Sequence, residues 1–169
     1  NSALQQAETG ATWLRRGMLG TPIFFATGNG YANSVAYPAA NDHTIAVGAT
    51  TDKAEIAAYS NSGPEVWVSA PSSGDHRGIM TTDVSYPNRG FNVGVHTDGG
   101  VDGFHTNDFG GTSSATPLVA GIAALVLSVA PDLDVTSLKE VLRKTADKIG
   151  TGYSGSPSHS PEFGYGRVN

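Results

Sequence analysis

Ser113 is the residue in this sequence whose neighbours most clearly suggest chemistry. Gly110, Gly111 and Thr112 precede it, and an apolar run follows it as far as Ala130. We expect the glycines to form a tight turn and the apolar run to form a helix, which would hold the serine hydroxyl at a positively polarised helix N-terminus. That position suits a nucleophile, and it also suits an ordinary serine that caps a helix.

The segments that would have to position Ser113 include several short predicted strands. Unbroken apolar runs at 22–26 and 44–49 are typical of strands that are buried on both faces of a parallel sheet. The stretch 66–71 alternates, and 79–83 is a further candidate strand. Residues 84–110 show no periodicity and contain many glycines and aspartates, so we expect one long surface loop there.

Two further helices are predicted, one near each end of the chain. Apolar residues recur at helical spacing over 3–18, and Gly20 is expected to end that helix. After Pro131 an amphipathic helix follows, with either Asp134 as its N-cap or Ser137 at the start of a capping box. Strands of this kind flanked by helices favour the α/β class.

Composition limits the class of protein and the kinds of partner. A chain of 169 residues is long enough for one domain. Its formal net charge of -5 argues against nucleic acid or an anionic membrane as a partner. The absence of cysteine excludes disulfides and thiolate chemistry. The longest apolar run, 117–130, is expected to be too short to cross a bilayer, and no signal peptide opens the chain.

The stretch 111–121 resembles the nucleophile signature of the subtilisin-like serine proteases. That signature reads Gly-Thr-Ser-x-Ala-x-Pro-x-Val-Ala-Gly, and every fixed place is matched. Segments 26–30, 37–49 and 59–71 resemble further parts of the same family in the same order. The resemblance implies the C-terminal part of a subtilisin-like three-layer fold, with a mostly parallel sheet flanked by helices. Within the family the chain looks most like bacterial relatives of the furin/kexin branch.

The resemblance assigns roles to the matched residues. Ser113 would attack the scissile peptide carbonyl to form an acyl-enzyme, while its backbone N–H and the side-chain amide of Asn29 would form the oxyanion hole. Ser114 would do no more than line the site. The residues that would form the substrate pocket are Ala26, Thr27, Gly28 and Ala36. Because residues 31–36 carry no carboxylate, we expect a narrow, neutral pocket for apolar or medium-sized side chains rather than for lysine or arginine.

The family's catalytic aspartate and histidine have no matching motif in this sequence. Both precede the serine in subtilisin-like proteases, and none of the five histidines here is followed by the family's Gly-Thr. We therefore interpret residues 1–169 as the C-terminal half of a peptidase domain. An N-terminal half, expected as a second chain, would supply the missing residues, and activity would require the two halves to assemble.

Other expectations follow from the family. They are a protein or peptide substrate, a zymogen precursor, a secreted or periplasmic location and no cofactor or metal in the chemistry itself. Structural Ca²⁺ is common in the family, and oxygen ligands are available in the predicted loop. The candidate calcium ligands are Asp98, Asp102, Asn107 and Asp108. Their spacing matches no EF-hand, so a solvated acidic loop is the alternative.

Two functions of other classes fit parts of the sequence. A catalytically inactive interaction module with the same fold would explain the missing aspartate and histidine, but it has no chemical need for both Ser113 and Asn29. A nucleotide-binding domain is suggested by Gly28 and Gly30 after a predicted strand, but the third glycine of that fingerprint is absent.

Overall fold

A parallel sheet of three strands forms the centre of the molecule. The computed structural model describes residues 2–84, 90 and 104–169. The strands are β1 (Phe24–Ala26), β2 (Ile45–Thr50) and β3 (Val66–Pro71), in the spatial order β1-β2-β3. Both pairings are parallel. The central strand β2 is buried along its whole length, as its unbroken apolar sequence predicts, whereas β1 is half-buried at the edge of this sheet.

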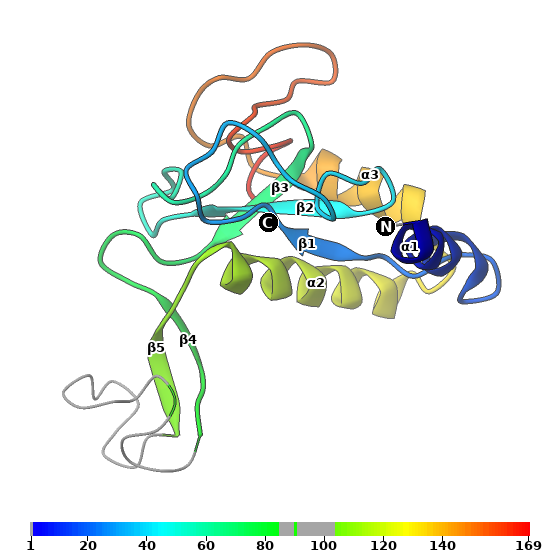
Figure 1. Ribbon diagram of the computed structural model, residues 1–169, viewed down its shortest axis with the longest axis horizontal. Coiled ribbons are helices and arrows are strands. Elements are labelled where there is room, and N and C mark those ends of the chain that lie inside the picture. The colour runs from blue at the N-terminus through cyan, green and yellow to red at the C-terminus, as the bar shows by residue number, and fades with distance from the viewer. Residues whose placement is uncertain (1, 85–89, 91–103) are drawn as a thin grey trace.

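Helices cover both faces of the sheet. Helix α2 (Thr112–Val129) lies along one face, and α3 (Val135–Thr145) lies on the other face with the C-terminal segment (Figure 1). Helix α1 (Ser2–Leu14) lies at the end of the sheet where the strands begin (Figure 1). The predicted α/β architecture, a mostly parallel sheet flanked by helices, is confirmed.

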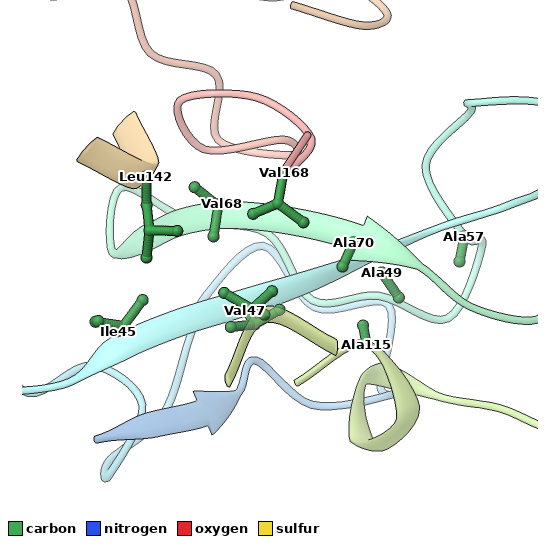
Figure 2. Packing of buried hydrophobic residues seen from close by; sticks show 10 residues of the cluster. Ile45, Val47, Ala49, Ala57, Val68, Ala70, Ala115, Leu142 and Val168 are labelled. Carbon is green, nitrogen blue, oxygen red and sulfur yellow. The ribbon is translucent and has the colours of Figure 1, made fainter. Parts of the chain in front are cut away.

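The main hydrophobic core lies on the two longer strands. Figure 2 shows its buried side chains gathered about β2 and β3, with Ala115 of α2 on one side and Leu142 and Val168 on the other. Several members are alanines, including Ala49 and Ala70. Small side chains allow the N-terminal turns of α2 to approach the strands closely, so this end of the helix is fixed by packing.

Helix α2 is apolar well beyond the face that it buries. Its 18 residues have a mean hydropathy of 1.7, and by length and composition it could cross a membrane. The sequence prediction that the apolar segment is too short to cross a bilayer is therefore wrong. It counted only residues 117–130, whereas the helix begins at Thr112. In the structure α2 packs on the sheet through residues such as Val119, while Leu125 and Val129 are 69% and 83% exposed.

A two-stranded antiparallel hairpin projects away from the sheet (Figure 1). It consists of β4 (Ile79–Thr82) and β5 (His105–Phe109). The strand predicted at 79–83 is therefore present, but the prediction of one continuous loop over 84–110 is wrong at its C-terminal end. Strand β5 buries little beyond Thr106, so it lacks the apolar alternation that identifies a strand in sequence.

The C-terminal end of α1 and the N-terminal end of α3 differ in part from the sequence prediction. Helix α1 ends at Leu14 rather than near Gly20, and the guanidinium of Arg16 donates to the carbonyl of Pro131 at 2.8 Å. In α3, Asp134 is the N-cap and accepts a hydrogen bond from the backbone N–H of Ser137 at 2.7 Å. The alternative start at Ser137 is therefore wrong.

Candidate active site

Ser113 lies in the first turn of α2, and it is exposed. The helix N-cap is Gly111, whose φ of 77° lies in the left-handed region that favours glycine. A residue in the first turn of a helix has no helical carbonyl four residues earlier with which its N–H could pair. The N–H of Ser113 therefore takes no part in the hydrogen bonds of α2. Among the described residues no side chain or backbone group hydrogen-bonds the Ser113 hydroxyl.

Asn29 lies beside the start of this helix, although 83 positions separate it from Thr112. Its Oδ1 accepts hydrogen bonds from both the backbone N–H and the hydroxyl of Thr112, each at 2.8 Å. Both lone pairs of Oδ1 are thereby used, so the orientation of the amide is defined. No acceptor among the described residues takes the two N–H groups of Nδ2. The side chain is therefore held by its oxygen and offers its nitrogen as a donor.

The sheet brings these two groups to one end of the molecule. Figure 1 shows the carboxyl end of β1 and the N-terminus of α2 at the same end of the sheet, where the β4–β5 hairpin leaves it. The loop 27–32 begins there, and the N–H of Gly28 donates to the Thr112 hydroxyl at 3.3 Å. A Cβ added to Gly111 would lie 3.0 Å from Asn29 Nδ2. The glycines on both segments therefore permit the close approach.

A chain of hydroxyl groups holds the turn before Ser113. Ser72 Oγ donates to the carbonyl of Gly111 at 2.7 Å, and its oxygen lies 2.6 Å from Ser114 Oγ and 2.9 Å from the Tyr59 hydroxyl. Ser114 is 1% exposed, so it does not line the site as expected but faces the interior. The Gly111 carbonyl also accepts hydrogen bonds from the N–H and the hydroxyl of Ser114, each at 3.1 Å, so Ser72, just after β3, adds a third donor to it.

The predicted pocket residues fall into two groups. Ala26, Thr27 and Gly28 lead from β1 directly to Asn29, and Thr27 is 3% exposed. Ala36 is exposed in the following loop. Its carbonyl accepts a hydrogen bond from the N–H of Ala40 at 3.1 Å, and within the described ranges no hydrogen bond joins it to the other three. The structure thus brings three of the four residues to the site.

The described histidines have partners of their own. The His43 ring packs edge-on against Trp13, and His159 bonds to the carbonyl oxygen of Val66 at 2.7 Å. His76 lies 3.6 Å from an Asp75 oxygen. His105 belongs to β5, and His96 lies outside the described residues. No hydrogen bond joins His43, His76 or His159 to Ser113 in the described part of the chain.

The candidate calcium ligands are only partly covered by the structure. Asp98 and Asp102 lie outside the described residues, and Asn107 and Asp108 are in β5. Within the described part of the chain, no group of three or more histidine, aspartate or glutamate side chains could hold a metal ion.

Sequence reasoning missed the residues that support the site from neighbouring segments. Thr112 and Ser72 bond to the two candidate groups or to the turn between them, and Asn61 binds the loop that carries Asn29. Their only sequence signal is a polar residue that follows a short predicted strand or turn.

The sequence and the fold both have clear relatives. The sequence profile of the Subtilase family matches residues 2–166. A calcium-dependent protease of Nostoc sp. is 39% identical over 159 residues, which are 89% of this chain and 24% of that protein. A halolysin-like extracellular serine protease of Natrialba magadii is 32% identical over 150 residues, which are 89% of this chain and 22% of that protein. This chain spans about a quarter of the length of these relatives.

The fold has a close counterpart among solved structures. The serine protease of Aeromonas sobria, crystallised in complex with a chaperone, matches with a TM-score of 0.83 at 21% identity. The match covers 99% of this chain and 38% of that protein. The profile match across nearly the whole sequence, together with the shared fold, shows that this chain belongs to the Subtilase family of subtilisin-like serine proteases.

Proposed function

We propose that this chain carries the nucleophile and the oxyanion hole of a serine endopeptidase. Ser113 Oγ attacks the scissile carbonyl carbon, and the carbonyl oxygen becomes an oxyanion that accepts hydrogen bonds from Asn29 Nδ2 and the Ser113 N–H. Collapse of this intermediate expels the amine and leaves an acyl-enzyme on Ser113, which water then hydrolyses. Family membership, relatives named as proteases and the geometry of Asn29 support this proposal.

The observation that carries the proposal is the fixed orientation of the Asn29 amide. Thr112 occupies Oδ1 with two hydrogen bonds, and the described residues leave Nδ2 without an acceptor. A donor that is already oriented and unpaired suits an oxygen that becomes negative only during reaction, because no reorganisation is needed then. A peptide-binding module without catalysis would have no use for such a donor beside an exposed serine.

The general base and its aspartate come, in this proposal, from a part of the peptidase domain outside residues 1–169. Ser113 needs a base to take its proton, and the described histidines with known partners lie elsewhere. The relatives are about four times as long as the matched region, which is consistent with further parts of the catalytic domain. The chemistry therefore belongs to the assembled domain rather than to this chain alone.

The test is covalent labelling of the assembled protease. A fluorophosphonate probe is expected to label the protein that contains both halves of the domain. Peptide mapping is expected to locate the label on Ser113. Labelling and peptidase activity should both vanish in S113A. The matched control is S128A, since Ser128 is an exposed serine at the far end of the same helix.

Two outcomes of that experiment would count against the proposal. Labelling that persists in S113A would place the nucleophile elsewhere. An assembled, folded protein that binds peptides but neither labels nor cleaves would favour the inactive interaction module.

The pocket proposal concerns the side chain that precedes the scissile bond. We infer that Ala26, Thr27 and Gly28 form one neutral wall of this pocket, without Ala36. Acidic side chains that would select lysine or arginine are missing from residues 31–36. Cleavage of a peptide library should therefore favour apolar or medium-sized residues, and a profile dominated by arginine would contradict this assignment.

We also propose an extracytoplasmic location and a structural calcium ion. The halolysin-like relative is named as extracellular and the Nostoc relative as calcium-dependent, and these names are the support. The ion is given no part in the peptide-bond chemistry, which the proposal assigns to the Ser113 hydroxyl and the Asn29 amide.

A further inference from the structure

Asn61 binds the loop that carries Asn29, and its contacts fall on both sides of that residue. The Oδ1 of Asn61 accepts hydrogen bonds from the N–H groups of Gly30 and Ala32, each at 2.9 Å. Its Nδ2 donates to the carbonyl of Thr27 at 3.0 Å. One carboxamide therefore spans residues 27–32.

The backbone of Asn61 adds a fourth hydrogen bond to the same loop. Its N–H donates to the carbonyl of Gly28 at 3.0 Å. Strand β1 ends at Ala26, so the loop beyond it has no ladder to satisfy its peptide groups. Asn61 supplies in one residue the partners that a neighbouring strand would otherwise provide.

The site has little tolerance for another side chain in place of Asn61. A carboxamide presents its acceptor and its donor on two separate atoms of one short side chain, and here both are used. The packing is close, since a Cβ added to Gly28 would lie 2.5 Å from Asn61 Nδ2. Aspartate would keep the acceptor oxygen but lose the donor to Thr27.

Asn29 is consequently held from two directions. Thr112 holds its side chain through Oδ1, and Asn61 holds the backbone on either side of it. We propose that Asn61 is a positioning residue for the oxyanion donor Asn29. This inference rests on the proposed function of Asn29.

The expected kinetic effect follows from this indirect role. If the loop shifts, Asn29 Nδ2 leaves the place where the oxyanion develops, while the walls that bind the ground-state substrate change less. An interaction made only in the transition state affects kcat rather than KM. Misplacing a catalytic group by about 1 Å costs up to about 100-fold in rate.

A double-mutant cycle in the full-length protease tests the inference. N61A, N29A and the double variant are compared by kcat and KM on one peptide substrate. We expect N61A to lower kcat about 10- to 100-fold with little change in KM. If Asn61 acts through Asn29, N61A should lower kcat much less when Asn29 is already alanine. S62A is the matched control, because Ser62 bonds to Asn33 in the same loop, at 3.4 Å, and should leave kcat unchanged.

The outcomes separate the inference from the proposed function. If N29A does not lower kcat, Asn29 is no oxyanion donor, and both statements fail. If N29A lowers kcat but the two losses multiply fully, Asn61 has only a general structural role and the inference alone fails. Should N61A not fold, N61D replaces it in the same cycle, with a smaller loss expected because two of the three side-chain bonds remain.

Discussion

Thr112 is the residue that joins the two candidate catalytic groups. It is 1% exposed, precedes Ser113 directly, and gives both its N–H and its hydroxyl to Asn29 Oδ1. A change that removes the hydroxyl at this position is therefore expected to alter the direction of Asn29 Nδ2 without removing either candidate group.

Replacing Thr112 by valine should slow the reaction while the protein stays folded. T112V keeps the shape of the side chain but loses the hydroxyl that donates to Asn29. Loss of about one hydrogen bond in the transition state predicts a kcat about 5- to 10-fold lower. Steady-state kinetics on a peptide substrate measures this, and T112S, which keeps the hydroxyl, is the control. A wild-type kcat in T112V would contradict this role.

Single residues differ in how far they could be predicted from sequence. Ser113 and Asn29 stand next to glycines at the ends of apolar runs, which are local signals. Ser72 and Asn61 act on partners 39 and up to 34 positions away. A hydrogen bond from a side chain to a distant backbone leaves no periodic pattern, so the chain order alone could not identify either residue.

At the scale of elements, α3 depends on a charged cap. The pKa of the Asp134 carboxylate is lowered below its ordinary value of 3.8. The main cause is the hydrogen bond from the backbone N–H of Ser137, and the Ser137 side chain is the second. A carboxylate whose pKa is lower in the folded than in the unfolded state stabilises the folded state at pH values above its unfolded-state pKa. This contribution is lost as the pH falls through its folded-state pKa.

This cap predicts a specific pH dependence. D134A should lower the melting temperature at pH 7, and the difference from the wild type should shrink below pH 3.8, where the wild-type carboxylate also becomes protonated. D134N is the control, because asparagine caps helices without titrating. Thermal unfolding of the full-length protein at several pH values measures both variants, and a constant difference for D134A would refute the prediction.

The elements that could be predicted are those that bury a regular apolar pattern. Strands β2 and β3 and helix α3 have such patterns, and their existence agrees with the sequence prediction. Strand β5 was missed because it pairs with β4 in a hairpin outside the main sheet and buries almost no apolar side chain. The end of α1 was misplaced because long-range contacts of Arg16 fix the turn that follows it.

At the scale of the whole molecule, the proposed calcium ion would add to stability. Of its candidate ligands, Asn107 and Asp108 lie in β5 of the projecting hairpin, whereas Asp98 and Asp102 fall outside the described residues. An ion bound only by the folded protein stabilises it by about 2.7 kcal/mol at 100 times its Kd.

Chelation tests this at the level of the full protein. EDTA should lower the melting temperature of the full-length protease, and added Ca²⁺, but not Mg²⁺, should restore it. Mg²⁺ is the control because it prefers a smaller, octahedral set of ligands. A melting temperature that EDTA leaves unchanged would exclude a stabilising calcium ion.

The overall α/β architecture could be predicted because few arrangements bury short parallel strands and an apolar helix together. The sequence could not predict which apolar residues of α2 stay exposed. A helix that is apolar on all sides does not indicate which side the sheet covers.

The hydrogen bonds from Thr112 to Asn29 also have a consequence for the newly synthesised polypeptide. Before the first strand and the long helix have docked, the serine is an ordinary alcohol with no amide facing it. In the proposed function, Ser113 would therefore gain its oxyanion donor only after this docking. The 83 positions between Asn29 and Thr112 make that contact a long-range step of folding.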